Sequence, residues 1–289
     1  MVDLSPVLDW YAGNARDLPW RRPEVSPWGV LVSEVMLQQT PVARVLPVWE
    51  RWMARWPRPA DLAAAPLSEA IRMWGRLGYP RRAMRLHQCA RAVVDRHDGE
   101  VPPELSALLA LPGIGAYTAR AVAAFGFGQR QPVVDTNVRR VVARAVTGAP
   151  DAGPATTRAD LAAVERLLPE APEVAVQLSV GLMELGALVC TARQPRCTAC
   201  PLTDRCAWRA SGQPLPGGPS RRPQRYAGTD RQVRGLILDV LRNASHPVTG
   251  AELDGVWPEP IQRRRALRSL LEDGLVVRHP DDRYALPEG

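Results

Sequence analysis

The chain has 289 residues, 46% hydrophobic and 23% charged, which is the ordinary composition of a soluble globular protein with one large domain or two to three smaller ones. No apolar run is long enough to span a bilayer and the N-terminus lacks the pattern of a signal peptide, so we expect a cytoplasmic protein without membrane attachment. The net charge of +7 favours a polyanionic partner, although all 37 basic residues are arginine, a bias typical of a GC-rich genome that weakens this inference.

Helical periodicity dominates the chain up to about residue 189, and no segment there alternates like a strand. Ser5-Pro6 suits a helix start, and Thr40-Pro41 suits the end of one helix and the start of the next. The part before Cys206 is therefore predicted to be all-α, with one helix that begins at Pro41 and nine more over residues 6–11, 28–39, 67–75, 80–97, 103–110, 117–125, 136–145, 158–168 and 173–189.

Residues 211–228 are rich in proline, glycine and arginine, which predicts a linker to a separate module over 229–289. In that module we expect helices over 230–242, 249–254 and 259–272 and a hairpin of strands 275–277 and 284–285. Three helices with a hairpin predict a small winged-helix-like fold.

Four of the five cysteines are crowded into 17 residues with the spacing Cys-x6-Cys-x2-Cys-x5-Cys. In a reducing compartment, thiolates this close together usually hold a metal ion or a cluster, and the spacing alone leaves structural zinc open. Cys89 lies in an apolar helical run and is predicted to be a packing residue. The predicted ligands are Cys190, Cys197, Cys200 and Cys206.

The cysteine spacing resembles the iron–sulfur loop of the endonuclease III and MutY group of DNA glycosylases. The resemblance runs from about Leu4 to Ala207 and implies a [4Fe–4S] cluster that organises a loop beside the DNA backbone. It also implies a mainly all-α, two-lobed fold, with a six-helix helix-hairpin-helix domain over 27–133 and a cluster domain built from 1–26 and 134–210. The implied partner is double-stranded DNA with mismatched or oxidised base pairs, bound by a monomer in the bacterial cytoplasm at the nucleoid.

The segment Leu111-Pro112-Gly113-Ile114-Gly115 lies between two predicted helices. Glycines on both sides of an apolar residue permit a tight turn that aims successive N–H groups at an anion, although an ordinary helix–helix turn reads the same way. The segment is similar to the helix-hairpin-helix of the same glycosylases, and this resemblance implies that Leu111, Gly113 and Gly115 contact a DNA phosphate.

Two carboxylates are candidate catalytic groups. Glu34 lies in the apolar helix segment SEVMLQQT, where desolvation would raise its pKa toward that of a general acid, unless it occupies one solvated face. Asp135 precedes a predicted helix, where aspartate is a preferred N-cap. SEVMLQQT resembles MutY-type adenine glycosylases; this implies that Glu34 protonates the purine, that Asp135 faces the sugar, and that Asn137 supports the site.

Bifunctional relatives place a lysine in the hairpin segment, which forms a Schiff base and nicks the strand. This chain has Tyr117 there and contains no lysine, so apart from the N-terminus it has no amine nucleophile. We therefore expect a monofunctional glycosylase, in which the resemblance makes Tyr117 an active-site hydrogen-bond donor.

The resemblance further implies that Gln39 and Tyr79 enter the duplex beside the flipped base and that Trp20 and Arg21 contact adenine, although Tyr79 and Trp20 could equally be core aromatics. The sequence departs from the family at Val180 and Pro80 and in having Asp-Thr-Asn for Asp-Gly-Asn. With a winged-helix-like module expected over 229–289, we expect the protein to lack the family's usual Nudix-like C-terminal domain. Preference for 8-oxoguanine is therefore left open. The arginines predicted to contact phosphates are Arg81, Arg82, Arg139 and Arg140.

The function predicted from the sequence is excision of adenine opposite 8-oxoguanine or guanine by acid-assisted hydrolysis. One alternative is a glycosylase for another mismatch such as T:G, against which Glu34 argues, and an endonuclease III-like lyase is disfavoured because lysine is missing. A DNA-binding protein without catalysis remains a third possibility.

Overall fold

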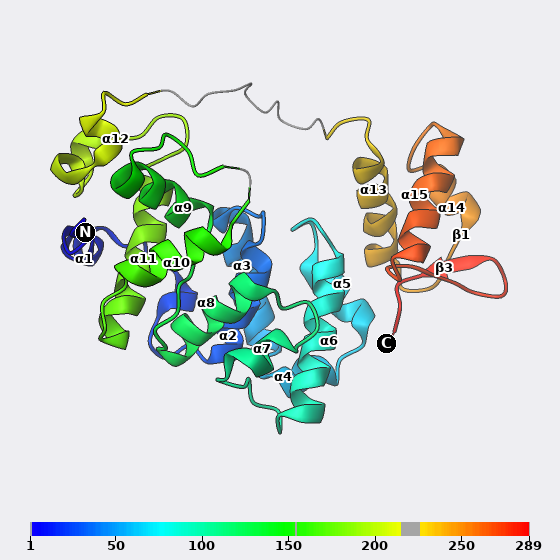
Figure 1. Ribbon diagram of the computed structural model, residues 1–289. Coiled ribbons are helices and arrows are strands. Elements are labelled where there is room, and N and C mark those ends of the chain that lie inside the picture. Colours follow the sequence, from blue (N-terminus) through cyan, green and yellow to red (C-terminus); the bar gives the residue numbers. More distant parts are fainter. Residues whose placement is uncertain (1, 154, 215–225, 289) are drawn as a thin grey trace. The chain divides into compact units, whose positions relative to one another are not determined.

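The computed structural model describes residues 2–153, 155–214 and 226–288, so most of the predicted linker 211–228 lies outside the described residues. The chain divides into two compact units (Figure 1). The first comprises Met1–Val30, Pro103–Leu109 and Gly115–Ser220, and the second comprises Leu31–Pro102, Ala110–Ile114 and Arg221–Gly289. The predicted domain boundaries at residues 27 and 134 stay predictions.

All ten helices predicted before the cysteines are present, with ends that differ by at most three residues from those expected. Within the described residues no strand precedes Val248, so the all-α prediction for this part is confirmed. None of the described helices is long and apolar enough to cross a membrane. The helices are α1 (Pro6–Asn14), α2 (Pro27–Leu37), α3 (Val42–Arg55), α5 (Leu67–Trp74), α6 (Arg81–Arg96), α7 (Leu105–Leu109), α8 (Ala116–Phe127), α9 (Thr136–Val142), α10 (Arg158–Leu167) and α11 (Pro172–Leu188).

Several short helical segments were not predicted, because a segment of three to five residues is too short to display helical periodicity. In α4 (Pro59–Ala63) a proline at the first position and a capping box between Arg58 and Asp61 start the helix locally. The α9 helix continues directly as one turn of π-helix. That turn is η2 (Ala143–Thr147), and its first three residues lie within the predicted helix 136–145. The remaining segments that were not predicted are η1 (Pro19–Arg21), η3 (Cys197–Ala199), η4 (Thr203–Arg205) and α12 (Ala207–Ala210).

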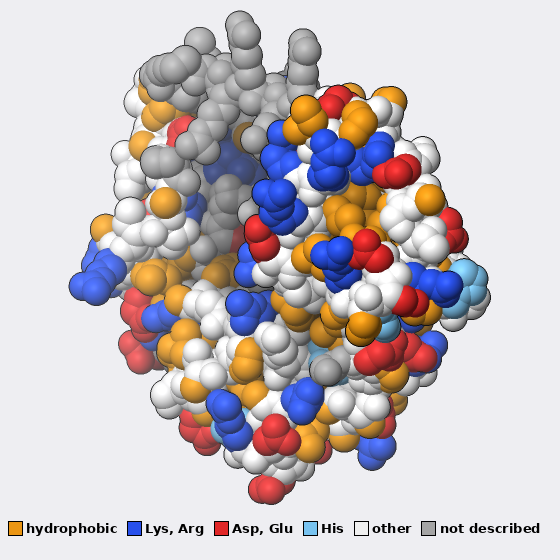
Figure 2. Space-filling model, turned by 90° about the vertical axis from the view of Figure 1, so that its right-hand side faces the viewer, with side chains coloured by type: hydrophobic (Ala, Val, Ile, Leu, Met, Phe, Trp, Pro, Cys, Tyr) orange, Lys and Arg blue, Asp and Glu red, His pale blue; other side chains and the backbone are white. Residues whose placement is uncertain are grey.

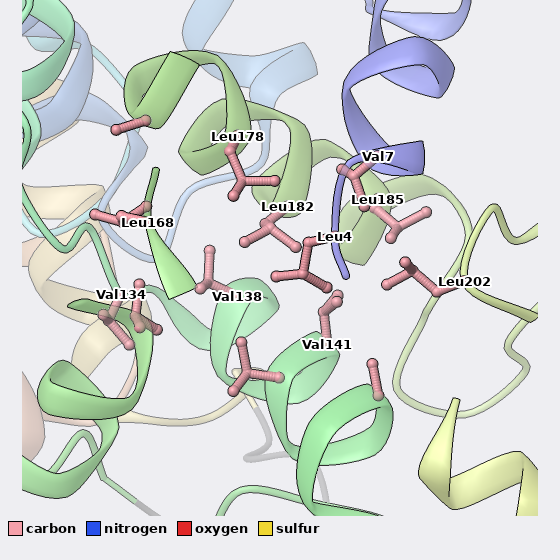
Figure 3. Packing of buried hydrophobic residues seen from close by; sticks show 14 of the residues in the cluster. Leu4, Val7, Val134, Val138, Val141, Leu168, Leu178, Leu182, Leu185 and Leu202 are labelled. Carbon is pink, nitrogen blue, oxygen red and sulfur yellow. The ribbon is translucent and has the colours of Figure 1, made fainter. Parts of the chain in front are cut away.

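The core of the first unit joins segments that are far apart in the sequence (Figure 3). Leu4 and Val7 from the N-terminus pack with Val138 of α9, with Leu182 of α11 and with Leu202 of the cysteine loop. Because each of these side chains is at most 4% exposed, burial of their apolar surface holds α9, α11 and the loop together.

The second unit contains helices α3 to α6 and the C-terminal module, which we define as residues 226–288. Trp52 packs edge-to-face against Trp56 and Trp74, with ring centroids 4.7 and 5.8 Å apart. The predicted helices of the module are found as α13 (Asp230–Asn243), α14 (Gly250–Asp254) and α15 (Pro260–Glu272).

The predicted hairpin is also present, and a strand that was not predicted joins it. The strands β1 (Val248–Thr249), β2 (Val277–Arg278) and β3 (Arg283–Ala285) form an antiparallel sheet in the order β1-β3-β2, with Val248 opposite Tyr284 and Val277 opposite Ala285. At two residues β1 is too short to show alternation. The module thus has the connectivity of a winged helix.

The C-terminal module is docked on α5 by reciprocal arginine contacts. Arg72 of α5 donates to the carbonyl oxygens of Arg242 and Ala244 at the end of α13, at 3.2 and 3.3 Å. Arg242 in turn donates to the carbonyl of Ile71 near the end of α5, at 3.2 Å. Each helix end thereby receives donors for carbonyls that have no partner within their own helix. Further contacts are the ion pair Arg76–Asp239 and the bond from the Leu67 amide to the Glu288 carbonyl.

Candidate active site

Asp135 is the N-cap of α9, as its position in the sequence predicts. Its carboxylate accepts the backbone N–H groups of Asn137 and Val138 at 2.8 and 2.7 Å, and its other oxygen accepts the Asn137 side-chain amide at 2.8 Å. Three donors and the positive end of a helix fix this carboxylate in one orientation and favour its charged form.

A chain of side chains connects Asp135 to the cysteine loop. Arg140 donates to the Asn137 side-chain oxygen at 2.7 Å, and its Nε donates to the carbonyl of Cys190 at 2.7 Å. A side chain at Gly186 of α11 would lie 2.6 Å from the Cβ of Asn137, so glycine is needed for α9 and α11 to approach. Most donors of Arg140 are engaged internally, and its interpretation as a phosphate contact stays a prediction.

Burial raises the pKa of Asp135, while its hydrogen bonds to Val138 and Asn137 and the charge of Arg140 lower it. Burial is the largest of these effects and the net pKa is above the ordinary value of 3.8. The anionic form of Asp135 is therefore maintained at some cost in folding stability.

Tyr117 lies in the first turn of α8 and is partly buried. It packs against the apolar cluster of Ala121, Ala124 and Val133, all at most 1% exposed. The aromatic ring is thus anchored on a rigid helix in the same unit as Asp135.

Arg21 and Trp20 lie in the 3-10 helix η1, and Trp20 is 7% exposed. Arg21 donates to the fully buried carboxylate of Glu184 at 2.9 Å, and Arg16 donates to the same carboxylate at 2.6 and 2.9 Å. Burial raises the pKa of Glu184, but the hydrogen bonds from Arg16 and Arg21 outweigh it and lower the pKa to about 2. The Nη1 of Arg21 is buried and has no hydrogen-bond partner among the described residues.

Glu184 was assigned no role from the sequence, and its function as the anchor of Arg16 and Arg21 was missed. The available signal was an acidic residue in the middle of the apolar helix 173–189, because such a residue needs a cationic partner when it is buried.

The four clustered cysteines line a single small cavity, together with Val189 and Trp208. Arg144, only 4% exposed, lies against the Trp208 ring and donates to the Cys190 sulfur at 3.5 Å. Burial raises the pKa of the Cys200 thiol to about 11, so its thiolate requires a bound metal. Four soft donors around an apolar cavity with a neighbouring cation fit an anionic iron–sulfur cluster.

In the second unit, Glu34 lies on α2 and is 6% exposed, between Ser33 and Val35, which are 0% and 4% exposed. The alternative that Glu34 occupies a solvated face is therefore wrong. Cys89 is also fully buried, which confirms its prediction as a packing residue.

Arg82 joins the end of α2 to the loop before α6. One terminal nitrogen, Nη1, donates to the carbonyls of Val35, Met36 and Gln38 at 2.9, 3.0 and 2.6 Å. The other, Nη2, donates to the Thr40 hydroxyl and to the carbonyl of Gly78, at 2.8 and 3.0 Å. These contacts occupy both terminal nitrogens, and the Nε is buried, which corrects the interpretation of Arg82 as a phosphate contact.

Gln39 and Tyr79, which flank the acceptors of Arg82, have left-handed backbones with φ of 55° and 48°. Such a conformation costs about 1–3 kcal/mol for a residue other than glycine and persists where the surroundings enforce it. Tyr79 is 47% exposed, so the interpretation as a core aromatic is wrong for it, whereas Trp20 is buried. The structure thus brings both residues to loops fixed by one arginine.

The two glycines of the hairpin segment have different reasons to be glycine. Gly113 has a φ of 78°, and a Cβ there would lie 2.7 Å from the Cβ of Arg85. Gly115, the N-cap of α8, has an extended backbone with φ of −92°, and a Cβ there would meet nothing within 4 Å. The fold therefore requires Gly113, whereas Gly115 keeps the start of α8 open.

Comparisons with known proteins give family matches both for the helical part of the chain and for the cysteine loop. The model of the HhH-GPD superfamily of base excision DNA repair proteins matches residues 32–166, and that of the iron–sulfur binding domain of endonuclease III matches residues 190–206. The adenine DNA glycosylase of Mycobacterium tuberculosis is 59% identical over 287 residues, which cover 99% of this chain and 94% of the relative.

Two solved structures have the same fold. A thermostable thymine-DNA glycosylase matches with a TM-score of 0.64 and 28% identity, over 72% of this chain and 95% of its own. Endonuclease III in a non-covalent complex with DNA matches with a TM-score of 0.62 and 25% identity, over 72% of this chain and 94% of its own. The match over residues 190–206 assigns an iron–sulfur cluster to the cysteine loop, so the zinc alternative is dropped.

We expect Arg82→Lys to lower the free energy of unfolding by about 2–4 kcal/mol, because one ammonium cannot reach five acceptors and leaves partly buried carbonyls unpaired. Urea unfolding followed by tryptophan fluorescence measures this. The matched control is Arg81→Lys on the same helix, whose side chain is 55% exposed and makes one ion pair, with Asp273 at 3.2 Å. Equal losses in the two variants would contradict the role assigned to Arg82.

The raised pKa of Asp135 predicts a pH-dependent stability difference between the wild type and Asp135→Asn. Between 3.8 and the higher folded-state pKa, the folded wild type binds more protons than its unfolded chain, so its stability relative to the variant falls as pH rises. Urea unfolding at intervals between pH 3.5 and about 7 measures the difference. A difference that stays constant, or grows in favour of the wild type with rising pH, would refute the assignment.

Proposed function

Because the chain belongs to the MutY-type adenine DNA glycosylases of the HhH-GPD superfamily, we propose that it removes adenine mispaired with 8-oxoguanine or guanine in double-stranded DNA. The observation that carries this proposal is the presence of two carboxylates, one to act as the acid and one to stabilise the sugar cation, the pair that glycosidic cleavage requires. Glu34 is buried in an apolar helix, and Asp135 is held by three donors at the start of α9.

In the proposed reaction Glu34 donates a proton to a ring nitrogen of adenine. The bond between the sugar C1′ and the base nitrogen then breaks, and both electrons leave with the neutral base. Asp135 stabilises the positive charge that develops on the sugar, with Asn137 holding its orientation and Tyr117 acting as a hydrogen-bond donor. Water adds to C1′ and releases its proton, which leaves an abasic site.

We propose that the chain does not cleave the strand. A lyase of this superfamily needs an amine that forms a Schiff base, and the chain has Tyr117 at that position and no lysine at all. Tyr117 is packed on α8 and has no amine chemistry.

The proposed ligands of the iron–sulfur cluster are Cys190, Cys197, Cys200 and Cys206, which line one cavity. When bound, the cluster supplies a rigid centre that organises residues 190–206 beside the DNA backbone. The contribution of this chain is the Arg140 bridge, which ties the Cys190 carbonyl to Asn137 and so to Asp135.

Most of the proposed DNA contacts are residues whose side chains are exposed or carry a hydrogen-bond donor without a partner among the described residues. Gln39 and Tyr79 are exposed on loops fixed by Arg82 and would enter the duplex beside the extruded adenine. Arg21, with a buried open donor, and Trp20 would contact the adenine. The hairpin residues Leu111, Gly113 and Gly115 would contact a phosphate. We further propose that the protein works as a monomer at the nucleoid in the cytoplasm.

Single-turnover base release on duplexes with A:8-oxoG, A:G, A:C and T:G tests the activity. We expect adenine release with strand breaks only after alkali, and a loss of at least about 100-fold in Glu34→Gln because its acid is removed. Glu50→Gln, exposed on α3, is the control and should leave the rate unchanged. Thymine release would favour the T:G alternative, breaks without alkali would contradict the lack of lyase activity, and no release with intact binding would favour a protein without catalysis.

The two hairpin glycines provide a second test. Gly115→Ala should leave the unfolding free energy almost unchanged but weaken DNA binding about tenfold, because a methyl group would stand where the phosphate meets the start of α8. Gly113→Ala should destabilise the fold, since it combines a positive φ with a clash against Arg85. Fluorescence anisotropy with a labelled duplex and urea unfolding give the two readouts. Normal DNA affinity of Gly115→Ala would rule out the proposed phosphate contact.

A further inference from the structure

The C-terminal module presents a basic face for which the excision chemistry has no use. The exposed side chains of α15 include Ile261, Arg264, Arg265, Arg268 and Glu272. At about 100° per residue these five positions fall within an arc of about 100°, so they form one stripe of the helix. The stripe carries three arginines against one glutamate, and its charge is complementary to a polyanion.

Of the three arginines, only Arg265 is paired within the described part of the fold. Arg265 forms a bidentate contact with Asp230 of α13, at 2.6 Å for both bonds. Arg264 and Arg268 form no hydrogen bond or ion pair within residues 226–288 or the rest of the described chain. Figure 2 shows basic side chains gathered in the upper part of the face that it presents, with fewer acidic ones among them.

The topology of the module indicates what this stripe would bind. A short helix, α14, is followed by a turn and then by α15, and β2 and β3 follow as a hairpin. In helix-turn-helix folds the second helix is the one that lies against the major groove of DNA. The exposed Ile261, at 65%, lies on the same stripe and suits the thymine methyl groups of that groove.

The module is held next to the loop that carries Tyr79. Asp273, at the end of α15, pairs with Arg81 at 3.2 Å and with Arg234 of α13 at 2.6 Å. The guanidinium of Arg231 lies 5.9 Å from the centre of the Tyr79 ring. The C-terminal end of α15 is therefore held near the loop that carries Tyr79, within the same unit.

We propose that the exposed face of α15 is a second DNA-binding surface, which grips duplex DNA outside the base pair under repair through Arg264 and Arg268. The proposal rests on the proposed function only in taking the ligand to be duplex DNA. It assigns to the C-terminal module a contribution to affinity and none to the cleavage of the glycosidic bond.

The test uses the full chain loaded with its cluster, and it measures binding to an undamaged 30-base-pair duplex across a range of salt concentrations. Arg264→Ala/Arg268→Ala should bind on the order of tenfold more weakly at about 0.1 M salt. The slope of log affinity against log salt should fall by about 1.8, as expected for two lost phosphate contacts.

The charge-matched control is Arg51→Ala/Arg91→Ala, whose arginines are exposed on α3 and α6 and should leave both quantities almost unchanged. Single-turnover adenine release at saturating enzyme should be equal in the wild type and both variants. An unchanged salt slope in Arg264→Ala/Arg268→Ala, or an equal change in the control, would overturn the proposal. Because binding to undamaged DNA needs no excision, a failure of this proposal can be distinguished from a failure of the proposed glycosylase activity.

Discussion

Arginine side chains that donate to the free carbonyls of helix ends are the interaction on which both units depend. The last four carbonyls of every α-helix have no partner within the helix, and they carry its negative end. Arg82 serves α2, Arg140 serves α11, Arg130 serves α10, and Arg72 and Arg242 serve each other's helices. A guanidinium suits this task because it presents five donors in one plane and remains charged when partly buried.

These contacts support, within each unit, the segments that carry the proposed site residues. Arg82 fixes the loops of Gln39 and Tyr79, whose left-handed backbones need an external restraint. In the other unit Arg140 restrains Asn137, which restrains Asp135. Groups that must enter a duplex, or face a developing charge, lose less entropy on binding when their backbones are held in advance. The same arginines therefore stabilise the fold and hold the proposed site residues in fixed conformations before DNA binds.

The helices, the cysteine loop and the winged-helix-like module could be predicted because their signals are local: periodicity, capping residues and short spacings. The N-cap role of Asp135 could be predicted for the same reason, because it depends only on the residues next to it. The distant acceptors of Arg82 and Arg140 could not be predicted, because they lie 42 to 50 positions away in the sequence. In sequence, an arginine that serves a helix end looks the same as one on a solvated face. The two-residue strand β1 was missed because its pairing with β3 bridges 34 positions or more.

The absence of lysine connects this architecture with the proposed chemistry. Arginine supplies the cations that fix the helices and those proposed to grip phosphates, and its guanidinium stays protonated at the pH of the cell. Burial lowers the pKa of Arg82 only to about 10, so even this guanidinium remains a cation and not a nucleophile. An abasic site is an aldehyde that amines attack, and a lysine beside it would be a competing route to strand cleavage. In the proposed reaction, arginines surround the abasic product with positive charge, and none of them is an amine that would open the phosphodiester bond beside it.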